Sequence, residues 1–432
     1  MEPILEGDLP LGGLARTHQP PTLALRILFL ATLLIPATFA QEANRLNVAA
    51  FGPVGLGGDD TEVFQTALNW TAALGQTLEI PASSSAYNIG PLYFPSNTSL
   101  FLDAGVVVQA RPGFSANQKL LNIVNVSNVH LQGNGAVFRM RKAEYTSGEY
   151  RHCLNIEGAS DVSITSISCN DSGGDGLYIG AGLKGYSARI QITDAKFDNN
   201  RRQGMSITSG IDVTIRRCNF TSTSGTAPAD GIDLEPNEPD NFLQNISIQD
   251  SVTGGNAGNG VGIDIRNLNS SSAPVAIVIE RHTSYANQKS GYYAINQNAG
   301  YNGVTGSILI RDSRSSFDSL YGAVANFYNA SGPTLTFQNL TVENPNQAHA
   351  TDDNTAVAVI RGGGGQGAIG NVSFVNTSIT DISGSLDRYF IFVDYSNIGL
   401  SKIQFIDPGV LFGAPSGGGL LMNHPVTTVD VR

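Results

Sequence analysis

The segment Val162-Ser-Ile-Thr-Ser-Ile167, followed by Gly176-Leu-Tyr-Ile179, carries the pattern that decides the fold. Its apolar residues alternate with polar ones, which is the period of a pleated strand. The same apolar pair recurs at intervals of about 30 residues, which marks a repeat architecture. The pairs are Leu100/Leu102, Val129/Leu131, Val162/Ile164, Ile190/Ile192, Val213/Ile215, Ile246/Ile248, Ile277/Ile279, Ile308/Ile310, Leu335/Phe337, Val372/Phe374 and Ile403/Phe405.

A second pattern recurs with the same period as the first. A glycine precedes another short strand at Gly176, Gly204, Gly231, Gly262, Gly291 and Gly322, and His152-Cys-Leu-Asn-Ile156 resembles the preceding member. The segments between are rich in Gly, Asn, Ser and Asp, which favour turns. We therefore predict an all-β solenoid of about 10–11 coils, each with three short strands whose inward side chains stack between coils.

The N-terminal part departs from this pattern. Val63, Ala67 and Leu68 have nearly helical spacing, and Asp59 and Asp60 precede them as helix caps should. Because an open solenoid end exposes its core, we predict a capping helix here. The predicted organisation is a signal peptide at 1–40, a cap with the first strands at 41–98, the solenoid at 99–410, and a C-terminal tail or cap at 411–432.

The first 40 residues resemble a signal peptide. An apolar run at 23–35 follows Arg16 and is too short for a membrane span, and Thr38-Phe-Ala40 is a plausible cleavage site. Eleven Asn-X-Ser/Thr triplets are compatible with secretion and glycosylation. Three cysteines permit one bridge at most, for which we prefer Cys153–Cys169. We expect a secreted, extracellular monomer without stable membrane insertion.

The charge balance excludes one class of partner. The net charge is -11 and the pI is about 5.0, whereas nucleic acid requires a basic surface. No cysteine cluster suggests zinc, and we predict no metal and no cofactor for a hydrolase.

Several segments resemble the pectate-lyase superfamily over about residues 46 to 410. They are Asn47-Val-Ala-Ala-Phe-Gly52, Gly57-Gly-Asp-Asp-Thr-Glu62, Leu78-Glu-Ile-Pro-Ala82, Tyr87-Asn-Ile-Gly-Pro-Leu92 and Ser99-Leu-Phe-Leu-Asp-Ala-Gly105. The resemblance implies a right-handed parallel β-helix with a site on the outer face of the stacked strands. The superfamily includes polygalacturonases, lyases and alginate epimerases. The Asn-Thr-Asp, Asp-Asp and Gly-His-Gly signatures of polygalacturonases are not in place, and the Asp-Pro-His motif of the epimerases is absent, so no catalytic residue is carried over.

The glycine pattern itself predicts a polar patch, because side chains at matching offsets form columns about 4.8 Å apart. Two residues after the glycine the column contains Asn155, Tyr178, Ser206, Asp233, Asp264 and Tyr293. The residue before it gives His152, Asp175, Gln203 and Asp230, and the fourth after it gives Glu157, Gly180, Thr208, Glu235 and Arg266. We predict catalytic carboxylates among Asp175, Asp230, Asp233 and Asp264, and substrate contacts from Tyr178, Arg202, Gln203, Glu235, Arg266 and Tyr293.

Crowded carboxylates raise at least one pKa, and paired carboxylates are the groups that glycoside hydrolysis uses. Asp233 and Asp264 are predicted about 5 Å apart on adjacent coils, near the retaining separation. Asp175 and Asp230 lie two coils apart, nearer the inverting one. For Asp233 and Asp264, turn capping is the structural alternative. An ion pair between Arg266 and Glu235 stays open, as do surface positions for Arg202 and the tyrosines.

The function that we predict is that of a glycoside hydrolase acting on an extracellular polysaccharide. Polysaccharides that contain uronates are among the candidate substrates. The alternatives are a Ca²⁺-dependent polysaccharide lyase, in which the acids hold the cation and an Arg or Lys abstracts a proton, and a uronate epimerase. A non-catalytic carbohydrate-binding β-helix protein is the third class.

Overall fold

A computed structural model describes most of the chain beyond the predicted signal peptide. The described residues are 44–296, 303–351, 355–360, 369–381, 389–394, 400–406, 411–412, 420–422 and 429–431. The predicted signal peptide and most of the predicted C-terminal tail lie outside them. The domain boundaries that we derived from the sequence therefore stay predictions.

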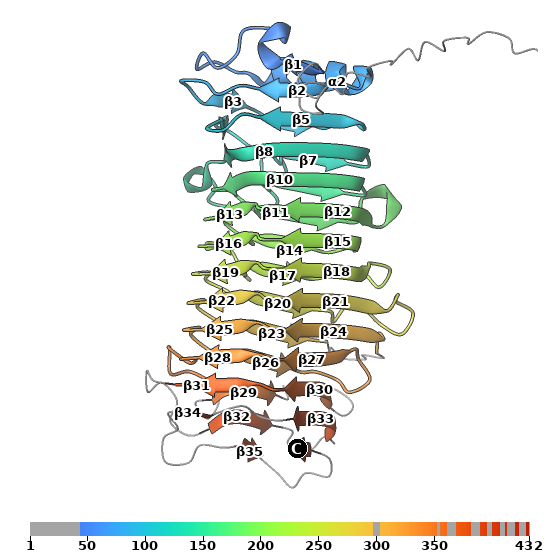
Figure 1. The fold of residues 1–432 in the computed structure, drawn as a ribbon, viewed down its shortest axis with the longest axis vertical. Helices are drawn as coiled ribbons and strands as arrows, with labels where there is room; N and C mark the ends of the chain where they lie inside the picture. The colour runs from blue at the N-terminus through green and yellow to red at the C-terminus, as the bar shows by residue number, and fades with distance from the viewer. Residues whose placement is uncertain are drawn as a thin grey trace, which may run out of the picture. The chain divides into compact units, whose positions relative to one another are not determined.

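The described chain is a right-handed parallel β-helix, as predicted (Figure 1). One coil consists of β12 (Ser187–Thr193), β13 (Lys196–Asp198) and β14 (Met205–Ile207). The next coil, formed by β15 (Gly210–Arg216), β16 (Asn219–Thr221) and β17 (Ile232–Leu234), pairs with it strand by strand and in parallel. The first two strands of each coil belong to sheet A, which has 24 strands, and the third belongs to the 12-stranded sheet B.

The remaining strands repeat this order. Sheet A also contains β1 (Arg45–Asn47), β2 (Thr77–Ile80), β3 (Tyr87–Ile89), β5 (Thr98–Leu102), β6 (Val107–Ala110), β8 (Ser127–Arg139), β10 (Ser160–Asn170), β18 (Leu243–Gln249), β19 (Val252–Gly254), β21 (Val275–Glu280), β22 (Thr283–Tyr285), β24 (Gly306–Arg311), β25 (Arg314–Ser316), β27 (Thr334–Gln338), β28 (Thr341–Glu343), β30 (Ile369–Val375), β31 (Ser378–Thr380), β33 (Leu400–Ile406), β34 (Leu411–Phe412) and β36 (Val429–Val431). Sheet B also contains β4 (Leu92–Tyr93), β7 (Leu121–Val124), β9 (Leu154–Glu157), β11 (Leu177–Gly180), β20 (Val261–Asp264), β23 (Tyr292–Ile295), β26 (Ala323–Asn326), β29 (Thr355–Ile360), β32 (Tyr389–Asp394) and β35 (Leu420–Met422).

The recurring apolar pairs form the core. Val162 aligns with Ile190, Ile190 with Val213, and Val213 with Ile246, and each of these side chains is at most 1% exposed. Each apolar side chain is thus covered by its counterparts above and below, and this burial is the main favourable term in folding. The alternation read from the sequence is therefore confirmed as the inward face of sheet A.

The glycines that precede the sheet B strands mark a close approach between coils. A Cβ on Gly204 would lie 2.4 Å from the backbone oxygen of Gly231, so no side chain fits. The column observed is Gly176, Gly204, Gly231, Gly260, Gly291 and Gly322. The predicted use of Gly262 is wrong, because Ile232 aligns with Val261. Gly260 and Gly262 lie two residues apart, so strand alternation cannot distinguish them.

The predicted N-terminal helix is α2 (Thr61–Leu74). Asp59 Oδ1 accepts a hydrogen bond from Thr61 N at 3.1 Å, and the helix ends at Gly75 in the left-handed conformation. Phe64, Ala67 and Leu68 are buried in the core. Its role as a cap for the first coil stays a prediction. Three short 3₁₀ helices complete the described elements, η1 (Val48–Phe51), η2 (Lys142–Glu144) and η3 (Gly182–Lys184).

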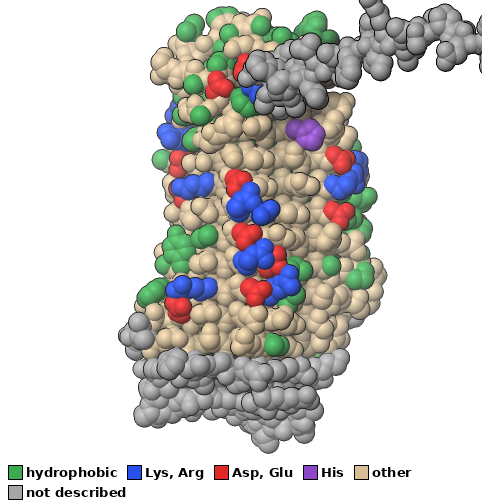
Figure 2. Space-filling view, viewed as in Figure 1, with side chains coloured by type: hydrophobic (Ala, Val, Ile, Leu, Met, Phe, Trp, Pro, Cys, Tyr) green, Lys and Arg blue, Asp and Glu red, His purple; other side chains and the backbone are tan. Residues whose placement is uncertain are grey.

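The outer surface carries many neighbouring charges of opposite sign (Figure 2). Arg217 binds Asp194 with an N–O distance of 2.6 Å, and Arg281 binds Asp250 at 2.6 Å. Such exposed pairs each contribute little to stability. In the described part of the chain, no helix has both the length and the apolar character to span a membrane. Cys153, Cys169 and Cys218 are buried free thiols, so the preferred Cys153–Cys169 bridge is not formed.

Candidate functional site

Polar side chains gather on the outward face of sheet B. The observed column is Asn155, Tyr178, Ser206, Asp233, Gly262 and Tyr293. Asp264 was predicted in this column, but the change of glycine places it in register with Glu235. The predicted separation of about 5 Å between Asp233 and Asp264 on directly paired positions is therefore wrong.

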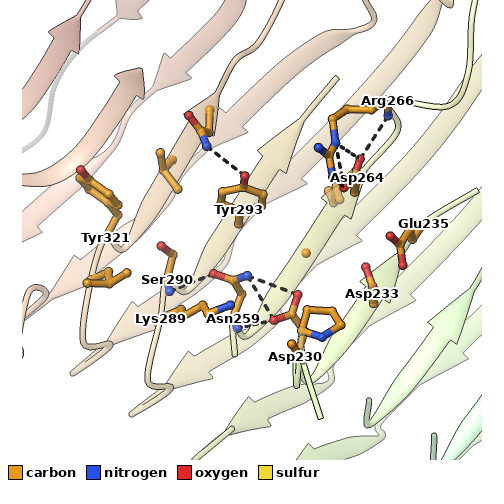
Figure 3. Close-up of a pocket in the computed structure, with 17 residues that line it drawn as sticks. Asp230, Asp233, Glu235, Asn259, Asp264, Arg266, Lys289, Ser290, Tyr293 and Tyr321 are labelled. Atoms are coloured by element: carbon orange, nitrogen blue, oxygen red, sulfur yellow. Dashed lines mark hydrogen bonds and ion pairs between the residues drawn. The ribbon is translucent and has the colours of Figure 1, made fainter. Parts of the chain in front are cut away.

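A cavity of about 640 Å³ opens over this face, between β17 and β26 (Figure 3). Its lining includes six of the predicted site residues, which are Asp230, Asp233, Glu235, Asp264, Arg266 and Tyr293. It also includes Asn259, Gly262, Lys289, Ser290 and Tyr321, which the sequence reading missed. Asn259, Ser290 and Tyr321 continue the column of Asp230. The correct glycine register would have found Asn259, whereas Ser290 and Tyr321 directly precede Gly291 and Gly322, which the predicted column already contained.

Asp230 is a buried acid whose carboxyl group accepts hydrogen bonds from Asn259. Its side chain is 3% exposed, and burial raises its pKa to about 7. Asn259 opposes this shift, because its backbone N–H donates to Oδ1 at 2.5 Å and its amide donates to Oδ1 at 3.1 Å and to Oδ2 at 3.3 Å. Oδ2 receives the weaker bond and is the better position for a proton.

Asp233 is the second buried acid of the cavity. Burial raises its pKa well above the ordinary value, and the nearby carboxyl groups of Asp230 and Glu235 raise it further. Gln203 connects the two acids, since its amide donates to Asp233 Oδ2 at 2.6 Å and its Oε1 accepts from Asp230 N at 2.7 Å. Gln203 was predicted as a substrate contact. It is fully buried and instead forms hydrogen bonds with both acids.

Both acids approach Gly262 closely at the wall of the cavity. A Cβ on this glycine would lie 2.4 Å from Asp230 Oδ2 and 3.5 Å from Asp233 Oδ1. Glycine therefore allows the Asp230 carboxyl group to lie against the backbone, and both carboxyl groups line the same cavity. No positive backbone angle requires glycine here, so it is this close approach that demands it.

Arg202 lies among three carboxylates. Its guanidinium nitrogens are 3.5 Å from Glu149 Oε2, 3.6 Å from Asp175 Oδ1 and 3.6 Å from Glu235 Oε2. These distances exceed good hydrogen bonds but are ion-pair distances. Arg202 was predicted to meet a substrate carboxylate or to lie on the surface. The structure instead places it half-buried, next to acids of its own chain.

Asp175 lies outside the cavity, in the layer beneath Arg202. It is fully buried, and neither carboxyl oxygen accepts a hydrogen bond from the described residues. Burial raises its pKa to about 6, while the Arg202 charge acts in the opposite direction. Its backbone N–H donates to His152 Nδ1 at 2.9 Å, which assigns the proton of a neutral His152 to Nε2. Burial lowers the pKa of His152 well below the ordinary value.

Tyr178 also lies outside the cavity. Its ring stacks on His152 with centroids 4.9 Å apart, and its hydroxyl bonds to Thr208 Oγ1 at 3.0 Å. One ring face is therefore already covered. Tyr293 does line the cavity, and its hydroxyl accepts a hydrogen bond from Asn326 at 2.9 Å.

Two cations line the cavity. Arg266 Nε donates to Asp264 at 2.9 and 3.0 Å, so the ion pair is with Asp264, whereas the sequence left one with Glu235 open. Lys289 is exposed at the edge, and its charge lowers the pKa of Asp230 against the effect of burial. Among the residues that the structure describes, no three His, Cys, Asp or Glu side chains form a group suited to a metal ion.

The fold defines a class, the right-handed parallel β-helix, which solved structures of other proteins share. The A-module of mannuronan C-5 epimerase AlgE4 from Azotobacter vinelandii aligns with a TM-score of 0.62 at 16% identity, covering 89% of this chain and 99% of that one. A polygalacturonase from Erwinia carotovora ssp. carotovora aligns with a TM-score of 0.57 at 15% identity, covering 80% and 94%. These identities establish the fold, and function must be argued from the site.

The sequence comparisons say less. No family model matches the chain. An uncharacterized protein of Bacillus subtilis (strain 168), YclG, is 27% identical over 156 residues. The match covers 33% of this chain and only 27% of that relative's length.

Proposed function

We propose that the protein is a secreted glycoside hydrolase that cleaves an extracellular polysaccharide in the sheet B cavity. The observation that carries this proposal is that the buried acids Asp230 and Asp233 line one cavity together with Glu235, and that both approach Gly262 in its wall. Solved proteins of similar fold are named for polysaccharides, a mannuronan epimerase and a polygalacturonase, which supports a carbohydrate substrate. We expect the protein to act as a monomer and without a metal.

Asp230 is the proposed general acid. A pKa of about 7 keeps a large protonated fraction near neutral pH and still lets the proton leave readily. A glycosidic oxygen bound in the cavity within hydrogen-bond distance of Asp230 Oδ2 would receive its proton as the bond to the sugar breaks. Asp233, which is kept neutral by burial and like charges, donates a hydrogen bond to a sugar hydroxyl.

Glu235 is the proposed ionised carboxylate. It lines the same cavity, is less buried than the two aspartates, and faces the Arg202 guanidinium at 3.6 Å. It either activates a water molecule or attacks the sugar carbon. NMR of the first anomer released distinguishes these two routes.

The test is a screen of the purified protein on acidic and neutral polysaccharides, with reducing ends and unsaturated products measured in parallel. We expect reducing ends without ultraviolet absorbance from unsaturated sugars. Asp230→Asn should lower this activity by about 100-fold or more. The matched control is Asp161→Asn, an exposed acid of sheet A paired with Arg189. Full activity in Asp230→Asn would contradict the proposed role.

A polysaccharide lyase is the second candidate, and the observation that favours it is the exposed Lys289 in the cavity. A lysine can abstract the proton next to a uronate carboxyl group, with Ca²⁺ bound by acids of the site. Unsaturated product that disappears with EDTA would support this candidate. An epimerase would change NMR signals without cleavage, and a binding protein would retain polymer after Asp233→Asn and never turn it over.

A further inference from the structure

The cavity is lined by more acidic than basic side chains. It is lined by four carboxyl groups, Asp230, Asp233, Glu235 and Asp264, and by two cations, Arg266 and Lys289. Arg266 already binds Asp264 through two hydrogen bonds from Nε. Lys289 is therefore the cavity cation that remains near Asp230, Asp233 and Glu235, of which Glu235 is the ionised one in the proposed function.

The neighbouring cation is also occupied. Arg202 lies beside Glu235 but contacts Glu149 and Asp175 at similar distances of 3.5 and 3.6 Å. A further carboxylate brought by a ligand would be the fourth around one guanidinium. Like charges at such distances are costly, so the central part of the cavity repels an anionic sugar.

The opposite end of the cavity is apolar and aromatic. Tyr321 and Val324 form a small buried cluster against which Tyr293 and Leu320 pack. All four residues line the cavity. Aromatic and aliphatic surfaces of this kind pack against the C–H face of a pyranose ring. At the other end, Glu235 can accept a hydrogen bond from a sugar hydroxyl, and the protonated Asp233 can donate one.

We propose that the substrate is a polysaccharide of uncharged pyranose sugars and not a polyuronate. This inference rests on the proposed function, because it assigns a substrate class to the same cavity. Neutral sugars supply the two features that the cavity can use, hydroxyl donors for its acids and a C–H face for its tyrosines. A uronate would add a second negative charge beside the ionised Glu235, with only Lys289 to offset it.

The experiment compares polymers that differ in charge alone. Polygalacturonate and alginate are each paired with their carboxyl-reduced forms, in which the backbone and linkages are kept, and a panel of neutral plant and microbial glycans is added. In low-salt buffer we expect release of reducing ends from neutral polymers, at a rate at least about tenfold above that from any polyuronate. Equal or faster cleavage of a polyuronate would overturn the inference.

Binding separates this inference from the hydrolase proposal. Asp233→Asn protein is run in affinity gels that contain the same polymer pairs. If nothing in the panel is cleaved, the hydrolase proposal fails, but stronger retardation by neutral polymers still supports the substrate class. Stronger retardation by polyuronates, or none by any polymer, overturns it. Retardation by neutral polymers should also be insensitive to added NaCl, since no counter-ions are exchanged.

Discussion

The carboxyl group of Asp230 and the α-carbon of Gly262 face each other so closely that a methyl group on Gly262 would lie 2.4 Å from Asp230 Oδ2. The two residues belong to adjacent coils, and both line the cavity. This contact links a backbone feature of the solenoid to the proposed acid.

Gly262→Ala should therefore abolish activity while the fold is retained. The added methyl group would collide with Asp230 Oδ2 and displace the Asp230 carboxyl group from its position in the cavity wall. We expect activity to fall by about 100-fold or more, with little change in the thermal unfolding midpoint. Gly58→Ala is the control, because a Cβ there meets no atom within 4 Å. A fully active Gly262→Ala protein would show that catalysis occurs elsewhere.

The pH profile should respond to Asn259. Its side-chain amide donates to Asp230 and thereby lowers the pKa of that acid against the effect of burial. Activity that requires protonated Asp230 should decline as the pH rises through about 7. Asn259→Ala removes the amide, raises this pKa further and should move the decline to higher pH. The measurement is kcat/KM against pH, and a decline that moves to lower pH would exclude Asp230 as the acid.

Arg202 should be a positioning residue that also stabilises the fold. Arg202→Met leaves Asp175 buried without its cation, which typically costs about 3–5 kcal/mol in unfolding free energy. Because the pKa of Asp175 is already raised to about 6, the loss should be larger at pH 8 than at pH 5.

A second variant separates stability from activity at this position. Arg202→Met combined with Asp175→Asn removes the buried charge and should restore much of the unfolding free energy. Activity should stay low, because Glu235 has still lost the guanidinium that faces it. Recovery of both properties would assign Arg202 a purely structural role. Urea unfolding and turnover of the same preparations provide the comparison.

Asp318 gives a pH-dependent test of the turns between sheets A and B. It is fully buried and accepts hydrogen bonds from Ser315 at 2.6 Å and from Asn287 at 2.9 Å, yet burial raises its pKa to about 6. A raised carboxyl pKa penalises the charged form, so stability is lost as the pH rises from about 4 through about 6.

Asp318→Asn should therefore stabilise the protein at pH 8 relative to the parent, by at most about 3 kcal/mol, and have little effect at pH 4. Asp161→Asn is the matched control of opposite sign, because the Arg189 partner holds the pKa of Asp161 below its ordinary value. Thermal unfolding midpoints at the two pH values decide between the outcomes. A destabilised Asp318→Asn protein at pH 8 would show that the charge itself is needed in the turn.

The sequence was sufficient to predict the columns but not their alignment at one coil. Val162 and its counterparts repeat with the strand period, so their stacking could be predicted without coordinates. Between Gly260 and Gly262 both alignments preserve the alternation of inward and outward side chains. The Gly231 N–H donates a hydrogen bond to the Asn259 carbonyl oxygen at 2.9 Å, which shows that Gly260 is the glycine of this coil in the column. With this alignment, Asp264 lies next to Glu235 in register, and Asn259 lies beside Asp230.

Taken by itself, the sequence determined that this chain is a β-helix with acids on one sheet face. The alternation of a strand and the length of a repeat can be read from the order of residues along the chain. Only the tertiary structure decided which acids are buried, which are paired and which face a common space. Asp175, Asp230 and Asp264 look alike in the sequence, but the first lies beneath Arg202, the second opposes Gly262, and the third binds Arg266. Desolvation and charge pairing depend on contacts between coils about 30 residues apart, and these contacts set the chemistry of each carboxyl group.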